Sequence, residues 1–197
     1  MPPLPLVSPI YNVILVIAFI GAFGPDAFAI VRESLSPRGE KRDRGSFFVA
    51  FGAMAIGWLL ASLCAVTLPQ ATFPGNRSAI FWAGITLMAL GTVFRFYAIR
   101  TLGRYFTREV AIHAGQKVIE SGPYRYIRHP SYSGLLLALL GLTLTLTNWA
   151  SLLVMTLCVA PGIGYRIFVE ERALRVALGQ PYIAYMARTR RLIPFVL

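Results

Sequence analysis

The chain contains few of the residues that most enzymes use for chemistry. Its 197 residues include only two cysteines and two histidines. Cys64 and Cys158 lie far apart in apolar runs, with no histidine or second cysteine beside them. This spacing predicts neither a disulfide framework nor a metal site. The sequence also has no Gly-rich phosphate-binding loop.

Acidic residues are scarce as well: the chain has 8 acidic and 19 basic residues, a net charge of +11. The basic residues gather at 32–44, at 100–128 and after Arg166, whereas the stretch 69–76 contains none. A basic excess can indicate nucleic-acid binding, but orientation in a membrane and attraction to anionic headgroups explain this distribution more simply. We therefore expect membrane lipids as partners, and no nucleic acid.

Charge is missing over long intervals. Fixed charges are absent from residues 45–76 and 78–94, and residues 1–25 contain no ionisable side chain except Tyr11. Each interval can supply the roughly 20 apolar residues with which a helix crosses about 30 Å of hydrocarbon. No basic residue precedes the first apolar run, so a retained helix is favoured over a cleaved signal peptide. With 56% hydrophobic residues, the sequence predicts an integral, multi-pass membrane protein.

We expect an all-α polytopic fold with about five transmembrane helices. The first three should span approximately residues 9–31, 46–68 and 79–99, so that residues 1–100 form the N-terminal helical part. Residues 101–197 should form one catalytic unit. The distribution of Lys and Arg near the span ends places the N-terminus outside and the polar segment 101–131 on the cytoplasmic side. This segment is predicted to be a loop with a short extended excursion around residues 109–112.

The fourth and fifth helices are expected to form a hairpin. No fixed charge lies between Arg128 and Arg166, and at 1.5 Å per residue this stretch is too long for one crossing. A turn near residues 147–149 would leave two legs packed on each other. Small residues in the legs would allow this approach: Gly134, Gly141, Gly162 and Gly164. The final segment, 170–191, is predicted as two short amphipathic helices divided at Gly179 and Pro181.

The polar stretch before the hairpin, GPYRYIRHPSYSG at residues 122–134, is the most informative part of the sequence. We call it the hinge. It combines Arg125, Arg128 and His129 with three tyrosines immediately before an apolar run. At the end of a membrane helix each of these polar groups needs a partner or a ligand. We therefore expect the chemistry of the protein here.

Three sequence blocks carry a resemblance to a known family. GQKVIESGPYRYIRHPSYSG, EERAL and GQPYIAYMARTRRLIPFVL begin at residues 115, 170 and 179. Together they resemble the isoprenylcysteine carboxyl methyltransferase family of membrane enzymes, over approximately residues 102–197. The resemblance implies a membrane methyltransferase that uses S-adenosyl-L-methionine.

The same resemblance implies roles for individual residues. Glu170 would bind the cofactor, and Arg166 would bind the substrate, so that both belong to the catalytic site. Further cofactor-binding positions are implied along the segment and hinge: Glu109, Gln116, Lys117, Val118, Ile119, Tyr124, His129, Pro130, Ser131 and Tyr132. Many relatives have histidine at position 116, and glutamine can still donate and accept hydrogen bonds. Many also have a third acidic residue where this chain has Arg172.

The residue types suit a sulfonium methyl donor, because aromatic faces attract a cation by about 0.5 to 2 kcal/mol. Tyr124, Tyr126 and Tyr132 are available for this purpose. The alternative for each tyrosine is an aromatic belt at the membrane interface. His129 could hydrogen-bond the cofactor, or could instead cap the helix that begins at Pro130.

Arg166 and Glu170 are four residues apart and share one face of a helix. A simple salt bridge is one interpretation. In the light of the resemblance, Arg166 would instead orient a carboxylate through a bidentate contact. A carboxylate is already nucleophilic at pH 7, so the reaction needs no general base.

These observations predict O-methylation of a carboxylate on a lipophilic or isoprenylcysteine-like molecule, which enters from the bilayer and reacts at a cytoplasmic active site. Three alternatives stay open. The first is N- or S-methylation of a lipid amine or a small thiol. The second is a membrane reductase that uses NADPH, and the third is a non-catalytic scaffold.

Overall fold

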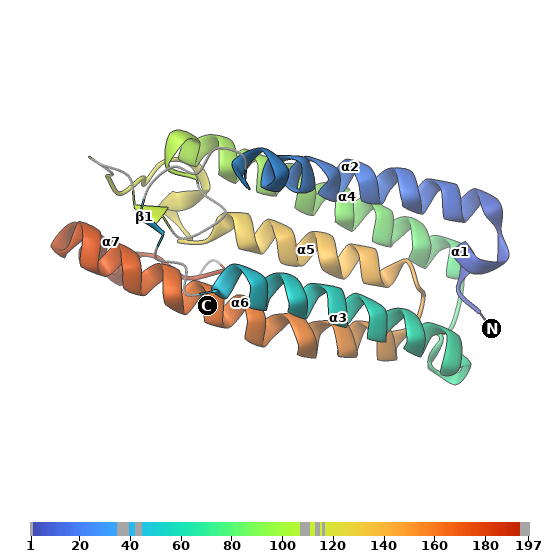
Figure 1. Ribbon diagram of the computed structural model, residues 1–197. Coiled ribbons are helices and arrows are strands. Elements are labelled where there is room, and N and C mark those ends of the chain that lie inside the picture. Colours follow the sequence, from blue (N-terminus) through green and yellow to red (C-terminus); the bar gives the residue numbers. More distant parts are fainter. Residues whose placement is uncertain are drawn as a thin grey trace.

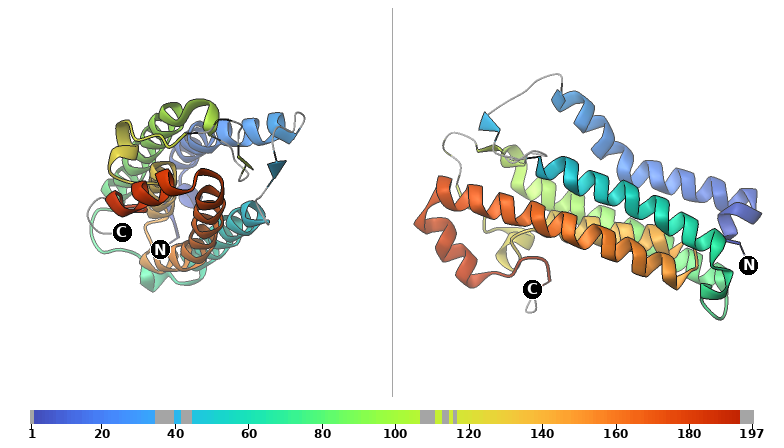
Figure 2. Two further views of the ribbon diagram at one scale, coloured as in Figure 1. Left: turned by 90° about the vertical axis from the view of Figure 1, so that its left-hand side faces the viewer. Right: turned by 60° about the horizontal axis from the view of Figure 1, so that its bottom comes forward.

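A computed structural model describes residues 2–34, 40–41, 45–106, 111–112, 115 and 117–193. Five long helices lie side by side, with the N-terminus at one end of the bundle and the last helix at the other (Figures 1 and 2). The long helices are α2 (Pro9–Ser34), α3 (Ser46–Thr67), α4 (Arg77–Leu102), α5 (Pro130–Leu144) and α6 (Trp149–Leu178), followed by α7 (Gln180–Arg188). The remaining elements are α1 (Leu4–Val7), η1 (Pro69–Ala71), η2 (Gly103–Tyr105), η3 (Gly122–Arg125), β1 (Glu40–Lys41) and β2 (Ala111–Ile112).

The helices have the length and composition of membrane spans. Four of those described are long and apolar enough to cross a bilayer: residues 9–28 of α2, and all of α3, α4 and α6. Helix α5 is apolar but shorter, with 15 residues, a rise of about 22 Å. Large apolar side chains cover the outside of the bundle, for example Leu59, Val93 and Leu157, each more than 60% exposed. A bilayer is the solvent that such a surface requires, so the protein is an integral membrane protein.

The predicted spans are confirmed to within three residues at each end. The hairpin turn is confirmed too, because α5 ends at Leu144 and α6 begins at Trp149. β1 and β2 pair antiparallel, with Glu40 opposite Ile112. This pairing confirms the extended excursion for residues 111–112, while residues 109 and 110 lie outside the described part of the chain.

The hairpin legs α5 and α6 contact each other, but the predicted role of the α5 glycines in that contact is wrong. Helix α5 packs chiefly on α4, and α6 packs chiefly on α3. A Cβ added at Gly134 would lie 2.7 Å from the carbonyl oxygen of Gly91, and one at Gly84 would lie 2.7 Å from the carbonyl oxygen of Gly141. The glycines of α5 therefore bring its backbone against the glycines of α4, where the close approach strengthens packing and weak Cα–H···O contacts.

The other two hairpin glycines differ from each other. A Cβ at Gly162 would lie 2.8 Å from the Cβ of Ala53 on α3, whereas Gly164 has open space around its position. Gly162 thus belongs to the contact between α3 and α6. Gly164 takes no part in helix packing.

The prediction of a separate short helix beginning near Glu170 is also wrong. Helix α6 continues to Leu178, because no glycine or proline interrupts the sequence between Arg166 and that residue. The break at Gly179 is confirmed: its φ of 60° ends α6, and α7 begins at the next residue. Arg166 and Glu170 are therefore held on one continuous helix.

The backbone contact between α4 and α5 leads to a stability prediction. We expect Gly84→Ala to destabilise the protein by about 2 kcal/mol, because the new methyl group would meet backbone atoms that cannot move independently. The midpoint of thermal unfolding in detergent should fall by about 4–8 °C. Gly164→Ala is the matched control and should leave the midpoint unchanged or slightly higher. Equal midpoints for the two variants would contradict the proposed contact.

Candidate functional site

The hinge is held in place by the chain that follows α7. The backbone N–H of Arg128 donates to the carbonyl of Arg190 at 2.7 Å, and that of His129 donates to the carbonyl of Arg191 at 3.0 Å. In return, the N–H of Arg190 donates to the carbonyl of Tyr126 at 3.1 Å. These bonds join two segments that are far apart in sequence and fix the entrance to α5.

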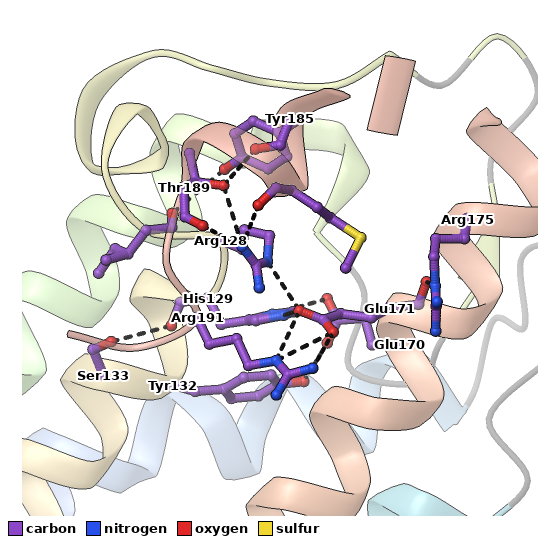
Figure 3. Close-up of polar contacts among 12 residues, drawn as sticks. Arg128, His129, Tyr132, Ser133, Glu170, Glu171, Arg175, Tyr185, Thr189 and Arg191 are labelled. Atoms are coloured by element: carbon purple, nitrogen blue, oxygen red, sulfur yellow. Dashed lines mark hydrogen bonds and ion pairs between the residues drawn. The ribbon is translucent and has the colours of Figure 1, made fainter. Parts of the chain in front are cut away.

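Glu171 fastens this arrangement to α6 (Figure 3). Its carboxylate, 2% exposed, accepts from Arg128 Nε at 2.9 Å and from Arg191 Nη2 at 3.1 Å. The Arg128 guanidinium also donates to the carbonyls of Met186 and Thr189. One buried carboxylate therefore joins the hinge, α6 and the segment after α7.

Glu170, the neighbouring residue, points elsewhere and is 27% exposed. Its Oε2 accepts a 2.7 Å hydrogen bond from the Tyr132 hydroxyl. That hydroxyl accepts in turn from Arg166 Nε at 3.0 Å, and Arg166 Nη1 donates to Ser46 Oγ at 2.8 Å. We call the series Ser46–Arg166–Tyr132–Glu170 the polar chain. It joins α3, α5 and α6.

His129 lies beside this chain. It occupies the N-cap position of α5, but its side chain makes no capping hydrogen bond. The ring stacks on Tyr132 with centroids 5.6 Å apart, and Nδ1 lies 3.9 Å from Glu170 Oε1. Nε2 is buried 3.4 Å from Glu171 Oε1, in a geometry that makes no hydrogen bond with any described residue. The capping interpretation of this side chain is therefore not supported.

The three hinge tyrosines have different surroundings. Tyr124 is buried, and its carbonyl accepts a 2.7 Å hydrogen bond from the Tyr185 hydroxyl. Burial, followed by the charge of Glu170, raises the pKa of Tyr124 far above its ordinary value, so the phenol stays neutral. Tyr126 is 53% exposed, with the Arg125 guanidinium 5.9 Å from its ring centroid. Of the three hinge tyrosines, Tyr132 thus contacts Glu170 directly, and Tyr124 is close enough to be influenced by its charge.

A cavity of about 510 Å³ opens beside the polar chain. Apolar side chains from α2, α3, α5 and α6 form most of its wall, and four polar residues lie at one end: Asp26, Arg95, Tyr132 and Arg166. Tyr132 and Arg166 therefore belong both to the polar chain and to the wall of the apolar cavity.

Sequence reasoning missed the ion pair at this end of the cavity. Arg95 Nε and Nη2 donate to the two carboxylate oxygens of Asp26 at 2.9 and 3.2 Å, and Nη1 donates to the carbonyl of Ser131 at 3.0 Å. The pair fastens α2 to α4. The signal was present, because an acidic residue in one apolar helix and an arginine in another each require a partner in a membrane. Ser46 was also missed as the partner of Arg166.

The remaining predicted site residues are placed as follows. Pro130 is the first residue of α5 and is buried, like Ser131. Lys117 is exposed, whereas Val118 and Ile119 are half-buried in the segment leading to η3. No hydrogen bond among the described residues connects these three to the polar chain. Glu109 and Gln116 lie outside the described residues.

Comparison with known proteins identifies the family. The sequence model of the isoprenylcysteine carboxyl methyltransferase (ICMT) family matches residues 84–176. Protein-S-isoprenylcysteine O-methyltransferase A of Arabidopsis thaliana is 31% identical over 143 residues, which cover 70% of this chain and 72% of that protein. The chain belongs to the ICMT family.

Two other relatives show how much of the ICMT family sequence is shared. Protein-S-isoprenylcysteine O-methyltransferase B of Arabidopsis thaliana is 35% identical over 129 residues, 63% of this chain and 65% of that protein. The Saccharomyces cerevisiae protein-S-isoprenylcysteine O-methyltransferase is 31% identical over 115 residues, 57% of this chain and 48% of that protein. The chain thus spans slightly less than two thirds of the first of these relatives and about half of the second.

The ICMT match confirms the resemblance over residues 102–176, ends before the block that begins at Gly179, and extends it toward the N-terminus. The expected similarity began near residue 102, whereas the matched region begins at Gly84. It therefore includes most of α4, with the glycines that position α5 and the hinge. Arg166 and Glu170 also lie within the matched region.

The adjacent glutamates of this ICMT member should respond differently to mutation. Glu171→Ala would leave the Arg128 guanidinium buried without its carboxylate, so we expect a loss of about 3 kcal/mol in stability. Glu170→Ala removes a partly exposed carboxylate and should change the unfolding midpoint much less. Thermal unfolding of both variants in detergent measures the contrast. A larger loss for Glu170→Ala would contradict the assigned roles.

Proposed function

We propose that this protein is an S-adenosylmethionine-dependent methyltransferase that O-methylates a carboxylate on a lipophilic, isoprenylcysteine-like molecule. One observation carries the proposal: Tyr132 and Arg166 connect the partly exposed carboxylate of Glu170 to the polar end of an apolar cavity. This arrangement suits a reaction between a water-soluble donor and a lipophilic acceptor, which would meet between Glu170 and Arg166.

The residues around Glu170 fit the methyl donor. His129 stacks on Tyr132, and its Nδ1 lies 3.9 Å from Glu170 Oε1, so a ring nitrogen lies beside the partly exposed carboxylate and is suited to a polar group of the donor. The aromatic side chains of Tyr124 and Tyr132 lie nearby and are suited to a cation. When bound, S-adenosylmethionine supplies an electrophilic methyl group on a sulfonium centre.

These residues would divide the binding task. His129 and Glu170 would hold polar groups of the donor, and Tyr124 and Tyr132 would adjoin its positive charge. Family resemblance adds further positions to the proposed donor site: Glu109, Gln116, Lys117, Val118, Ile119, Pro130 and Ser131.

The cavity fits a lipophilic acceptor. Its apolar wall would hold a hydrocarbon chain, and Arg166 would orient a carboxylate at the polar end. Tyr132 and Ser46 hold the guanidinium of Arg166 at the cavity wall, and its planar fork matches the geometry of a carboxylate. The acceptor carboxylate is ionised at pH 7 and needs no base. A positively charged amine acceptor would instead be repelled by Arg166.

The site would lie on the cytoplasmic side. Arg100, Arg125, Arg128 and Arg188 lie at the end of the bundle that contains the polar chain, whereas Arg77 begins α4 at the opposite end. The excess of basic residues near the first end favours a cytoplasmic position. A water-soluble donor would enter there, and the acceptor would enter from the bilayer.

The experiment measures labelled methyl transfer from S-adenosylmethionine to N-acetyl-S-farnesylcysteine by purified protein, with mass spectrometry of the product. We expect a methyl ester from wild type. Arg166→Ala should lower kcat/KM by about 100-fold, the equivalent of two charge-assisted hydrogen bonds of about 1.5 kcal/mol each. Its affinity for S-adenosylhomocysteine should change much less.

Arg172→Ala is the matched control, because Arg172 is an exposed arginine on the same helix. Its activity should equal that of wild type. Unchanged ester formation by Arg166→Ala would remove this residue from its proposed role. Oxidation of NADPH by the wild-type protein without any methylated product would contradict the proposed function itself.

A further inference from the structure

An exposed strip of α6 leads from the apolar outside of the bundle to two arginines. Residues spaced three or four positions apart along a helix lie on the same face, and this face of α6 carries Leu157, Tyr165, Phe168, Arg172 and Arg175. All five residues are exposed. The strip therefore joins side chains that suit hydrocarbon to two positive charges on one side of a single helix.

Arg166 marks the membrane boundary on α6. Its Nη1 donates to Ser46 Oγ, and Ser46 is the first residue of α3. The 22 residues of α3 rise about 32 Å, close to the hydrocarbon thickness of about 30 Å. Arg172 and Arg175 lie six and nine positions beyond Arg166. Their backbones are therefore about 9 and 14 Å outside the hydrocarbon.

Both arginine side chains can reach back toward the bilayer. Side chains on an α-helix tilt toward its N-terminus, and α6 begins at the opposite end of the bundle from the hinge. Arg175 has this direction, because its Nε donates to the carbonyl of Glu171, one turn earlier, at 3.4 Å. Figure 3 shows Arg175 on the opposite side of Glu171 from Arg128. An extended arginine spans about 6 Å, enough to place both guanidiniums in the headgroup layer.

The two arginines line an open hollow of about 410 Å³, together with Phe168 and Val176. Phe168 is 53% exposed and Val176 is 72% exposed. No acidic side chain lines the hollow. Neither guanidinium forms an ion pair with any residue in the part of the chain that the structure describes. The hollow thus offers two positive charges beside apolar surface.

These features match the two parts of an anionic phospholipid. Guanidiniums bind phosphate oxygens through charge-assisted hydrogen bonds, and an acyl chain can lie along Phe168 and the apolar strip below it. A soluble phosphate compound would leave that apolar surface without a partner. A zwitterionic headgroup carries its own cation, which the two arginines would repel. The charge and the apolar contact together therefore favour an anionic lipid.

We propose that Phe168, Arg172 and Arg175 form a binding site for an anionic phospholipid in the leaflet next to the hinge. The site is separate from the proposed methyl-transfer site, because Arg172 lies about 200° around α6 from Glu170. The inference therefore goes beyond the proposed function and does not depend on it.

The test compares two lipids with the same acyl chains. Dioleoylphosphatidylglycerol is anionic, and dioleoylphosphatidylcholine is zwitterionic. Each is titrated into purified protein in a neutral detergent, and native mass spectrometry gives the dissociation constant of the first bound lipid. Wild type should bind phosphatidylglycerol about tenfold or more tightly than phosphatidylcholine. Equal affinities for the two lipids would overturn the proposal.

Two double variants separate a defined site from general attraction to a basic surface. Arg172→Ala/Arg175→Ala should weaken phosphatidylglycerol binding about tenfold and leave phosphatidylcholine binding unchanged. Arg100→Ala/Arg125→Ala is the matched control, because it removes two exposed arginines from the same end of the bundle and neither lines the hollow. It should keep the wild-type preference. Equal weakening by the two double variants would overturn the site.

A third variant tests the apolar part of the site and keeps both arginines. Phe168→Ala should weaken the binding of both lipids several-fold, because an acyl chain loses its contact with the ring. Glycerol 3-phosphate, added at the same concentration as the lipid, should displace almost no phosphatidylglycerol from wild type. Unchanged lipid affinity in Phe168→Ala, or ready displacement by glycerol 3-phosphate, would rule out a phospholipid as the occupant.

Discussion

The hydroxyl of Tyr132 accepts a hydrogen bond from Arg166 and donates one to Glu170. A buried guanidinium and a carboxylate near a membrane boundary are costly unless each is paired in good geometry. A neutral phenol between them meets this requirement and keeps the two charges apart. In the proposed site, the carboxylate would therefore face one reactant while the guanidinium faces the apolar cavity proposed for the other.

Two pairs of helices produce this junction. Glycines bring α5 against α4 and so set the position of Tyr132, while α6 packs on α3 and places Arg166 beside Ser46. Glu171 then ties α6 to the hinge and to the segment after α7. Glu171 and Glu170 are adjacent on α6, so the bonds that fix Glu171 also fix the position of Glu170.

Hydropathy and charge spacing were sufficient to predict the spans, the hairpin turn and the break at Gly179, because each depends on a local pattern. Helix pairing could not be predicted from the sequence, because a glycine such as Gly134 allows another helix to approach closely but does not determine which helix that is. The family motif indicated Glu170 and Tyr132. The Tyr132 hydroxyl connects Arg166 to Glu170, and Asp26 pairs with Arg95 between α2 and α4. Both arrangements depend on contacts between segments that are distant in sequence. The cofactor- and substrate-binding roles of all the site residues, including Glu109 and Gln116, remain predictions from resemblance.

A double-mutant cycle on Tyr132→Phe and Arg166→Ala tests the junction most directly, with kcat/KM for methyl transfer to a carboxylate acceptor as the readout. If the phenol acts by orienting Arg166, the coupling between the two positions should be large. The account predicts that Tyr132→Phe lowers kcat/KM in the wild-type background and causes little further loss once Arg166 is absent. Fully additive losses would show that the two side chains act independently and would contradict the account.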